Sequence, residues 1–538
     1  MLTSRSCQEW HFGKKGQHSR ICKCYNKTDK MNLIKKFKKQ EKYTRYSILI
    51  IILFSVIVLA LTSIHHVSGD GCWYVPVGKF MAENQNFPLF EPLGRDEPFW
   101  SPPLYHVLVA IVYGIFGAVN NSLGNFAVKF VSPIFGILSL IFTFLVVKKL
   151  VNSKIAFYSI LFLAFIPIFI GYSVLSYVES TLIFFVILSV YFLINDKIIL
   201  AGIAAGLSIL AKYNGVFIIP VLLYIVYKKY SKKQFYKNGL IIAILPLIVA
   251  SPWLIRNWIL LGNPIWPFLN FIFNGYESMS YGSLNFSNLF HYGLLLFTYL
   301  GIFGVPDGNF HLFSTFKLPY SEVLLPIWLV GTFIFIIPLI VGFFNKSQKN
   351  KNIKNNLRTL IIGALAIWII SYLILFLLYV PNVGWAVSRI ILPAFPALAV
   401  FWAFGYEKLN NSKLSKLFVI LITLIIAGFI FTEFVKFGFA ANQWNFYKED
   451  FDWVKSNTPQ KSIFLVSGQC IPYNIQRTSL FSTDENLNKA DYIWVNQNFK
   501  LDKRSVLDES SLNSIESENY KEVYSNKKTG TLIYSTKP

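Results

Sequence analysis

The chain has 538 residues, of which 54% are hydrophobic and 17% aromatic, and its mean hydropathy is +0.48. Soluble domains contain about 45–50% apolar residues, so this excess and the repeated long apolar runs indicate a polytopic membrane protein. The net charge of +23 does not indicate nucleic-acid binding, because the basic residues cluster in short segments between apolar runs. That distribution is the positive-inside pattern of membrane proteins. The five cysteines do not make a disulfide framework.

The first 45 residues are strongly basic and predict a disordered tail on the cytoplasmic side. The sequence from Met31 resembles a more ordinary N-terminus. An alternative interpretation is therefore that translation starts at Met31 and that the start codon at Met1 is mis-set. We expect no cleavable signal peptide, because the first apolar run starts late and is long enough to span a membrane. One set of potential zinc ligands has a spacing that fits no common finger, so zinc is not favoured: His11, His18, Cys22 and Cys24.

The first spanning helix is predicted at 46–66 and runs outward, because the basic tail precedes it. Residues 67–103 are polar, aromatic and proline-rich and predict a long outer loop. The apolar stretch 104–117 is short for a span. If it crossed the membrane, the lysines between 148 and 154 would lie outside, so we interpret it as a juxtamembrane helix.

The remaining apolar runs alternate in direction and bring the total to eleven spans, which places the C-terminus outside. A second outer region, 255–321, contains a short apolar stretch at 289–304 that we expect to be interfacial or re-entrant. Outer loops 67–125 and 255–321 are expected to close the outer cavity. The further spans are predicted at 126–147, 155–172, 181–194, 198–211, 213–227, 238–254, 322–344, 359–380, 390–406 and 417–435.

Residues 436–538 are polar and differ in character from the rest. Strand-like runs at 463–466, 492–495 and 531–534, with a helix near 450–455, predict a small external α/β domain. The expected fold class is therefore an all-α polytopic membrane protein with a small external C-terminal α/β domain. Its parts are a tail at 1–45, a transmembrane region at 46–435 and the domain at 436–538. No inverted repeat typical of many secondary transporters is evident.

Asp70 is the leading candidate for a catalytic residue, because it lies where the first helix leaves the membrane on the outer side. A carboxylate there is well placed to act as a base on a substrate held at the bilayer surface. Glu179 lies in a short outer turn and is the second candidate. Residues that could bind a substrate at the outer helix ends and loops are Tyr74, Arg95, Asp96, Glu97, His106, Lys212, Arg256 and Arg389.

Each candidate also has a purely structural interpretation. Charges at the membrane interface are inexpensive and are often solvated loop residues. The Lys212 side chain could snorkel to the surface, and Arg389 could bind lipid headgroups instead of a substrate phosphate. His65 and His66 could suggest a metal, but adjacent histidines at a helix end are more often interfacial residues. Cys72 and Cys470 are both expected outside, and a bridge between them is not favoured.

Five segments carry a resemblance to a known family, and they occur in the family's order. The motifs are Gly-Asp-Gly-Cys-Trp-Tyr, Pro-Pro-Leu-Tyr, Gly-Leu…Lys-Tyr, Pro-Trp…Arg-Asn…Gly-Asn-Pro and Arg…Leu-Pro…Pro. They lie at 69–74, 102–105, 205–213, 252–264 and 389–396. The chain thereby resembles the GT-C superfamily of membrane glycosyltransferases, most closely its protein-mannosyltransferase and aminoarabinose-transferase branch. Gly71 stands where many relatives have a second acid, and Ser101 where aminoarabinose transferases have a phosphate-contacting lysine.

The resemblance implies a hexosyl or pentosyl transferase that uses a sugar on a polyprenyl or dolichyl phosphate. Asp70 would act as the general base in a single displacement with inversion, and a cation would stabilise the leaving phosphate. The candidates for that cation are Arg95, Lys212, Arg256 and Arg389. Glu179 would orient the acceptor or bind a cation. The resemblance implies no particular cofactor, and a requirement for a divalent metal ion is left as an alternative.

The acceptor implied by the resemblance is a protein, a lipid or a glycan, and the expected location is a prokaryotic cell membrane. Two rival functions remain. One is a transporter or flippase of lipid-linked glycans, although transporters usually place their charges at the membrane midplane. The other is an oligosaccharide ligase or oligosaccharyltransferase, although the tail lacks the Trp-Trp-Asp signature of the latter.

Overall fold

The protein is described by a computed structural model. It describes residues 7–8, 23–24, 41–88, 99–276, 302–303, 321–344, 354–379, 388–410, 415–466, 470–481, 484–487, 489–496 and 520–537. Most of the basic tail, the zinc set apart from the backbone of Cys24, and nearly all of the apolar stretch 289–304 lie outside these residues. Two short strands, β1 (Cys7–Gln8) and β2 (Lys23–Cys24), pair antiparallel.

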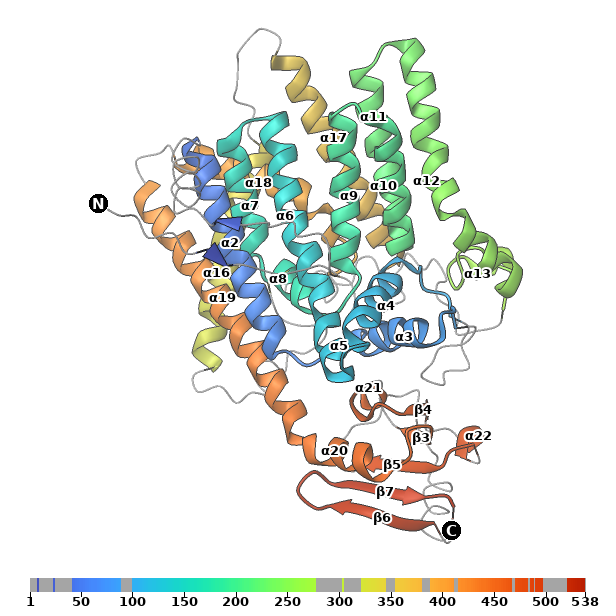
Figure 1. Ribbon diagram of the computed structural model, residues 1–538. Coiled ribbons are helices and arrows are strands. Elements are labelled where there is room, and N and C mark those ends of the chain that lie inside the picture. Colours follow the sequence, from blue (N-terminus) through green and yellow to red (C-terminus); the bar gives the residue numbers. More distant parts are fainter. Residues whose placement is uncertain are drawn as a thin grey trace.

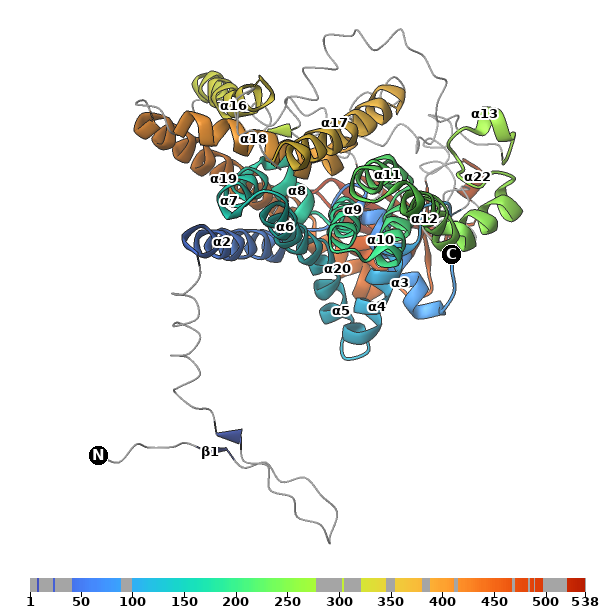
Figure 2. The same ribbon diagram turned by 90° about the horizontal axis from the view of Figure 1, so that it is seen from above.

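Long helices form a bundle in which most axes run side by side, as the two perpendicular views show (Figures 1 and 2). The predicted apolar runs are mostly helical where they are described, although 155–172 is broken at Ile166, and 198–211 has the predicted bounds. The helices are α2 (Lys42–Ile64), α6 (Val131–Leu150), α7 (Ser153–Phe165), α8 (Pro167–Val174), α9 (Glu179–Ile194), α10 (Ile198–Ala211), α11 (Ile218–Lys229), α12 (Lys232–Leu261), α16 (Ser321–Phe344), α17 (Lys354–Tyr379), α18 (Phe395–Asn410) and α19 (Ser415–Phe446). Short 3₁₀ turns at Val128–Phe130 (η1), Tyr213–Phe217 (η2) and Leu392–Ala394 (η5) precede α6, α11 and α18.

Four described helices are long and apolar enough to cross a membrane, and a fifth span is possible if α7 and α8 are counted together. The axes of α7 and α8 differ by 65° at the break between these two helices. Pro167 explains the break, since proline has no N–H to continue the α7 ladder and fits the first position of a new helix. Several other apolar helices are shorter than a span requires. The expected count of eleven spans is therefore not confirmed.

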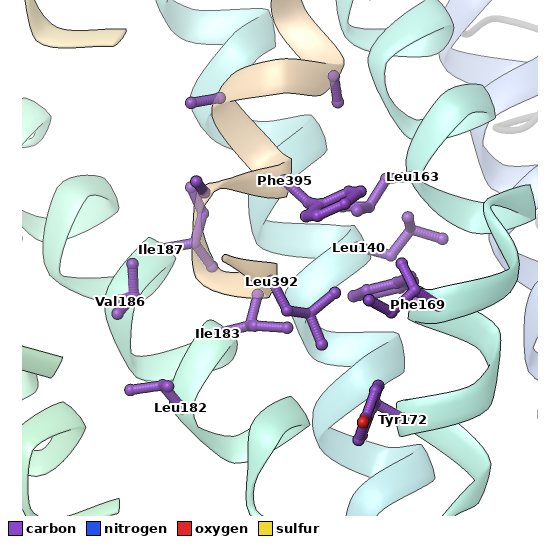
Figure 3. Packing of buried hydrophobic residues seen from close by; sticks show 14 of the residues in the cluster. Leu140, Leu163, Phe169, Tyr172, Leu182, Ile183, Val186, Ile187, Leu392 and Phe395 are labelled. Atoms are coloured by element: carbon purple, nitrogen blue, oxygen red, sulfur yellow. The ribbon is translucent and has the colours of Figure 1, made fainter. Parts of the chain in front are cut away.

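The bundle core is a dry cluster of aliphatic and aromatic side chains. Figure 3 shows side chains from α6, α7, α8, α9 and the start of α18 gathered around one another. Leu140, Leu163, Ile183, Leu392 and Phe395 are each no more than 1% exposed. Lipid tails are as apolar as these side chains, so inside a membrane the cluster is stabilised by van der Waals packing rather than by removal from water. This cluster fixes η5 against α9.

Two short helices, α3 (Gly71–Asn84) and α4 (Leu104–Gly117), lie across one end of the bundle (Figure 1). The bounds of α4 match the prediction. Helix α3 lies inside the predicted outer loop 67–103, for which the sequence predicted no helix. Pro76 and the glycines of this segment suggested a loop, but the helix is stabilised by packing against α4. Gly78 permits the contact, because a Cβ there would lie 2.5 Å from Val109. A third short helix, α5 (Asn121–Ala127), follows α4.

The C-terminal residues form a five-stranded sheet of order β4-β3-β5-β7-β6. β3 is parallel to β4 and β5, whereas β7 is antiparallel to β5 and β6. The buried Asp450 of α20 joins helix to sheet, because it accepts hydrogen bonds from Tyr524 (2.7 Å) and Thr531 (2.7 Å). The elements are α20 (Lys448–Asn457), β3 (Ile463–Val466), α21 (Ile471–Ile475), β4 (Thr478–Phe481), α22 (Asp484–Leu487), β5 (Tyr492–Asn496), β6 (Lys521–Asn526) and β7 (Thr531–Ser535).

We call the described residues from α20 to β7 the C-terminal unit. It lies beyond the bundle end that carries α3 and α5 (Figure 1). A disulfide joins Cys72 of α3 to Cys470, which precedes α21, with 5.0 Å between the Cα atoms. The expectation that these two cysteines stay unbridged is therefore wrong. The pairing spans 398 positions, so it depends on tertiary packing that no local pattern reveals.

Candidate active site

Asp70 lies in a tight turn between α2 and α3. Gly69 adopts a left-handed conformation with φ +54°, which favours glycine. A Cβ on Gly69 would lie 2.1 Å from the hydroxyl oxygen of Tyr177. The same hydroxyl accepts a hydrogen bond from the backbone N–H of Asp70 at 2.9 Å. Gly69 therefore permits the conformation that holds Asp70 close to the turn before α9.

Asp70 forms an ion pair and hydrogen bond with Arg389, which lies in the turn before η5. The side chain of Asp70 is 31% exposed and that of Arg389 is 18% exposed, so the pair is reachable from solvent. Burial alone would lower the pKa of Arg389, but the carboxylates of Asp70 and Glu179 raise that pKa well above its usual value. Arg389 is therefore a permanent cation beside the candidate base.

Glu179 is the first residue of α9, and only 1% of its side chain is exposed. Its Oε1 atom accepts a hydrogen bond from Lys212 Nζ at 2.9 Å and lies 4.0 Å from Arg389 Nε. The positive end of the α9 dipole favours an anion at this position. Among the described residues, its Oε2 atom has no hydrogen-bond partner. Asp70, Arg389, Glu179 and Lys212 thus form a continuous chain of alternating charge.

This charge chain brings together segments that are far apart in the sequence. Asp70 comes from the turn after α2, Glu179 from α9, Lys212 from the end of α10 and Arg389 from the turn before α18. All four lie at the bundle end that carries α3 and α4. Four of the predicted site residues are therefore neighbours.

Tyr74 lies next to this chain. It is buried in α3, and its ring contacts that of Tyr177 with 6.0 Å between centroids. Burial, together with Glu179 and Asp70, raises the pKa of Tyr74 well above its usual value, so its hydroxyl stays protonated. Tyr177 was not predicted as a site residue. Its place two residues before Glu179, in the same turn, is the signal that could have identified it.

His106 does not reach the charge chain. It is fully buried in α4, its Nδ1 atom lies 3.2 Å from the carbonyl oxygen of Tyr74, and the rings of Trp73 and Phe99 surround it. Burial lowers the pKa of His106 to about 3, so the imidazole is neutral. Its position indicates a role in holding α3 against α4, and the prediction that it binds substrate gains no support.

Arg256 is also separate from the charge chain. It donates hydrogen bonds to the carbonyl oxygens of Phe99 (2.8 Å) and Pro88 (3.1 Å), and its guanidinium lies 4.5 Å from the centre of the Trp253 ring. These contacts hold both ends of segment 89–98. Arg95, Asp96 and Glu97 belong to that segment and lie outside the described residues.

The histidines after α2 contact protein groups. The His65 ring packs edge-on against Phe437, with 5.0 Å between centroids, and burial lowers its pKa to about 3. His66 pairs with the amide oxygen of Asn445 at 3.2 Å. Within the described part of the chain, no three His, Cys, Asp or Glu residues come together as metal ligands. The carboxylates of Asp70 and Glu179 instead share the cation Arg389.

Comparisons with known proteins identify a family model that matches part of the chain and solved structures with the same fold. Residues 100–256 match the family model described as dolichyl-phosphate-mannose-protein mannosyltransferase. The apo crystal structure of ArnT from Cupriavidus metallidurans has a TM-score of 0.59 at 12% identity, covering 92% of this chain and 98% of that chain. The chain has the GT-C fold. The resemblance to the protein-mannosyltransferase and aminoarabinose-transferase branch is thereby confirmed.

Two further structures share this GT-C fold. ArnT bound to undecaprenyl phosphate has a TM-score of 0.57 at 12% identity, covering 91% of this chain and 97% of that chain. The oligosaccharyltransferase AglB from Archaeoglobus fulgidus, in complex with an inhibitory peptide and a dolichol-phosphate, has a TM-score of 0.51 at 13% identity. That match covers 85% of this chain and 70% of the AglB chain. No curated protein sequence matches this chain significantly.

Proposed function

We propose that the protein is a glycosyltransferase that moves a sugar from a polyprenyl or dolichyl phosphate to an acceptor hydroxyl at the non-cytoplasmic face. The observation that carries the proposal is the charge chain of Asp70, Arg389, Glu179 and Lys212 at one end of the bundle. It brings a partly exposed carboxylate and two cations to one end of the bundle, and these groups could supply a base and stabilise a leaving phosphate. The lipid phosphates named in the ArnT and AglB structures support the donor class.

Asp70 is the general base in this proposal. The acceptor hydroxyl loses its proton to the Asp70 carboxylate while its oxygen attacks the anomeric carbon. The bond from that carbon to the phosphate oxygen breaks, and the lipid phosphate leaves with the electron pair. A positioned base contributes about 10²–10⁴-fold to such a rate. The 31% exposure of Asp70 leaves room for an acceptor to reach it.

Arg389 and Lys212 stabilise the leaving phosphate. Both cations lie within 4.0 Å of the same Glu179 oxygen, so Glu179 holds them close to each other before the donor binds. Removal of a single donor that stabilises developing negative charge typically costs about 10²–10³-fold in rate. Glu179 is too deeply buried to meet the acceptor, and its role is to position the two cations. Arg256 is a less favourable choice, because its hydrogen bonds are to backbone carbonyls of 88 and 99.

The non-cytoplasmic location follows from the positive-inside rule. The basic residues at the end of α11 and the start of α12, including Lys228 and Lys232, lie at the bundle end opposite α3 and α4 (Figure 1). Lys148 and Lys149, in the last turn of α6, lie at that same far end. The charge chain and the C-terminal unit would then face outward.

The test is to incubate the purified protein with radiolabelled prenyl-phosphate sugars and candidate protein, lipid or glycan acceptors. We expect the label to appear on an acceptor, and Asp70→Asn protein to be the matched inactive control. Movement of intact lipid-linked sugar across a vesicle membrane without transfer would favour a transporter or flippase. Transfer of an oligosaccharide from a lipid donor would favour the oligosaccharyltransferase alternative, which the likeness to AglB keeps relevant.

A further inference from the structure

The Cys72–Cys470 disulfide lies unusually close to the candidate base. Cys72 is the second residue after Asp70 and is fully buried. Its backbone N–H donates to the carbonyl oxygen of Gly69 at 3.0 Å, and that of Trp73 donates to Asp70 at 3.0 Å. The residue that carries the bridge is therefore part of the hydrogen-bonded turn that carries the carboxylate.

The Asp70 turn is held from two directions. On the bundle side, the Tyr177 hydroxyl accepts the Asp70 N–H. On the opposite side, the bridge connects the turn to Cys470, which caps the start of α21 in the C-terminal unit. Helix α21 has only five residues, yet Tyr473 within it packs against the core of the bundle. The bridge therefore connects two packed bodies, with the Asp70 turn between them.

Few other side-chain contacts join α21 to the bundle within the described residues. One is a hydrogen bond from Asn121 in α5 to Gln476, at 3.2 Å between Nδ2 and Oε1. The chain itself connects the bundle to the C-terminal unit at a second place, where α19 leads into α20. Without the bridge, the α3 side of this junction would depend on packing and on that hydrogen bond.

We propose that the Cys72–Cys470 bridge is a positioning device that holds the Asp70 carboxylate in its productive place and fixes the C-terminal unit beside the active site. This inference rests on the proposed function. A catalytic group misplaced by 1 Å can lower a rate by about 10²-fold. Glu179, Lys212 and Arg389 come from α9, α10 and the turn before α18, which the bridge does not touch. Loss of the bridge should therefore lower kcat far more than it raises the KM for the donor.

The experiment uses the full chain with the three remaining cysteines, Cys7, Cys22 and Cys24, replaced by serine. Dithiothreitol reduces the bridge in folded protein, and removal of the reductant with mild oxidation restores it. We expect kcat to fall about 10-fold or more on reduction and to return on reoxidation, while the donor KM changes less than about twofold. Cys72→Ser, Cys470→Ser and the double variant should show equal losses, because each removes the same bond.

Gln476→Ala is the matched control, since it removes the hydrogen bond between Asn121 and Gln476 and leaves the bridge intact. We expect this variant to have the same kcat as the unmodified protein. Hydrogen exchange gives a readout that does not need activity, because reduction should speed exchange at the amides of residues 72–74 and leave those of α9 unchanged. If the oxidised protein transfers sugar and the reduced protein does so at the same kcat, the inference is wrong and the proposed function stands. If no form transfers sugar, the proposed function fails and the inference fails with it.

Discussion

Replacement of Arg389 separates its proposed role at the phosphate from a structural one. In Arg389→Ala, Lys212 keeps its 2.9 Å hydrogen bond to Glu179, and the 31% exposed Asp70 can be hydrated, so we expect a folded protein. A hydrogen bond to a charged group contributes about 1.5–3 kcal/mol, so the loss of one predicts donor binding weaker by about 10–10²-fold. Loss of charge stabilisation in the transition state should lower kcat by a further 10²-fold or so.

Arg389→Lys should retain part of the activity, because an ammonium supplies the charge but cannot bind two phosphate oxygens side by side. The assay is titration with a prenyl phosphate followed by steady-state transfer kinetics. Lys212→Ala should also weaken donor binding, whereas Arg256→Lys, the matched control outside the charge chain, should do so less. Normal binding and turnover in Arg389→Ala would contradict the assignment and leave Arg389 as a headgroup contact.

Three further predictions concern topology, the Asp70 turn and metal dependence. A cysteine at Ser231 should be labelled only from the cytoplasmic side and one at the exposed Asn457 only from outside, and the reverse pattern in intact cells would overturn the orientation. Gly69→Ala should lower transfer by about 10²-fold, because its Cβ would lie 2.1 Å from the Tyr177 hydroxyl and displace Asp70, whereas Tyr177→Phe should lose only about tenfold. Since Arg389 and Lys212 serve the phosphate, transfer should survive EDTA, and loss that Mg²⁺ or Mn²⁺ restores would show that a cation takes part.

The sequence predicted those parts of the fold that depend on local patterns. The helices at 104–117 and 198–211 and the strand at 463–466 were predicted with their observed bounds, because an apolar run between turn residues marks each of them. Helix α3 was missed, since its Pro76 and glycines favour a loop locally and tertiary packing against α4 decides the outcome. The 65° bend after α7 was also missed, although Pro167 marks its position.

The sequence singled out the four residues of the charge chain as candidates, but it did not predict their geometry. Asp70, Glu179, Lys212 and Arg389 could be singled out because each is a charge at the end of an apolar run. Their order in the charge chain depends on how four distant segments pack, which no local signal carries. The same limit explains the Cys72–Cys470 bridge. His106 and Arg256 were predicted as substrate-binding residues because of their side-chain chemistry. In the structure, both instead contact backbone carbonyl oxygens of neighbouring segments.

The proposed mechanism depends on Asp70 as the base. Asp70→Asn keeps the size of the side chain, and its amide oxygen can still accept from Arg389, but it cannot take up the acceptor proton. The decisive measurement is single-turnover transfer from a radiolabelled prenyl-phosphate sugar, made alongside donor binding by the same purified protein. We predict donor binding within a few-fold of the unmodified protein and a transfer rate lower by about 10²–10⁴-fold. An unchanged transfer rate in Asp70→Asn would contradict the mechanism.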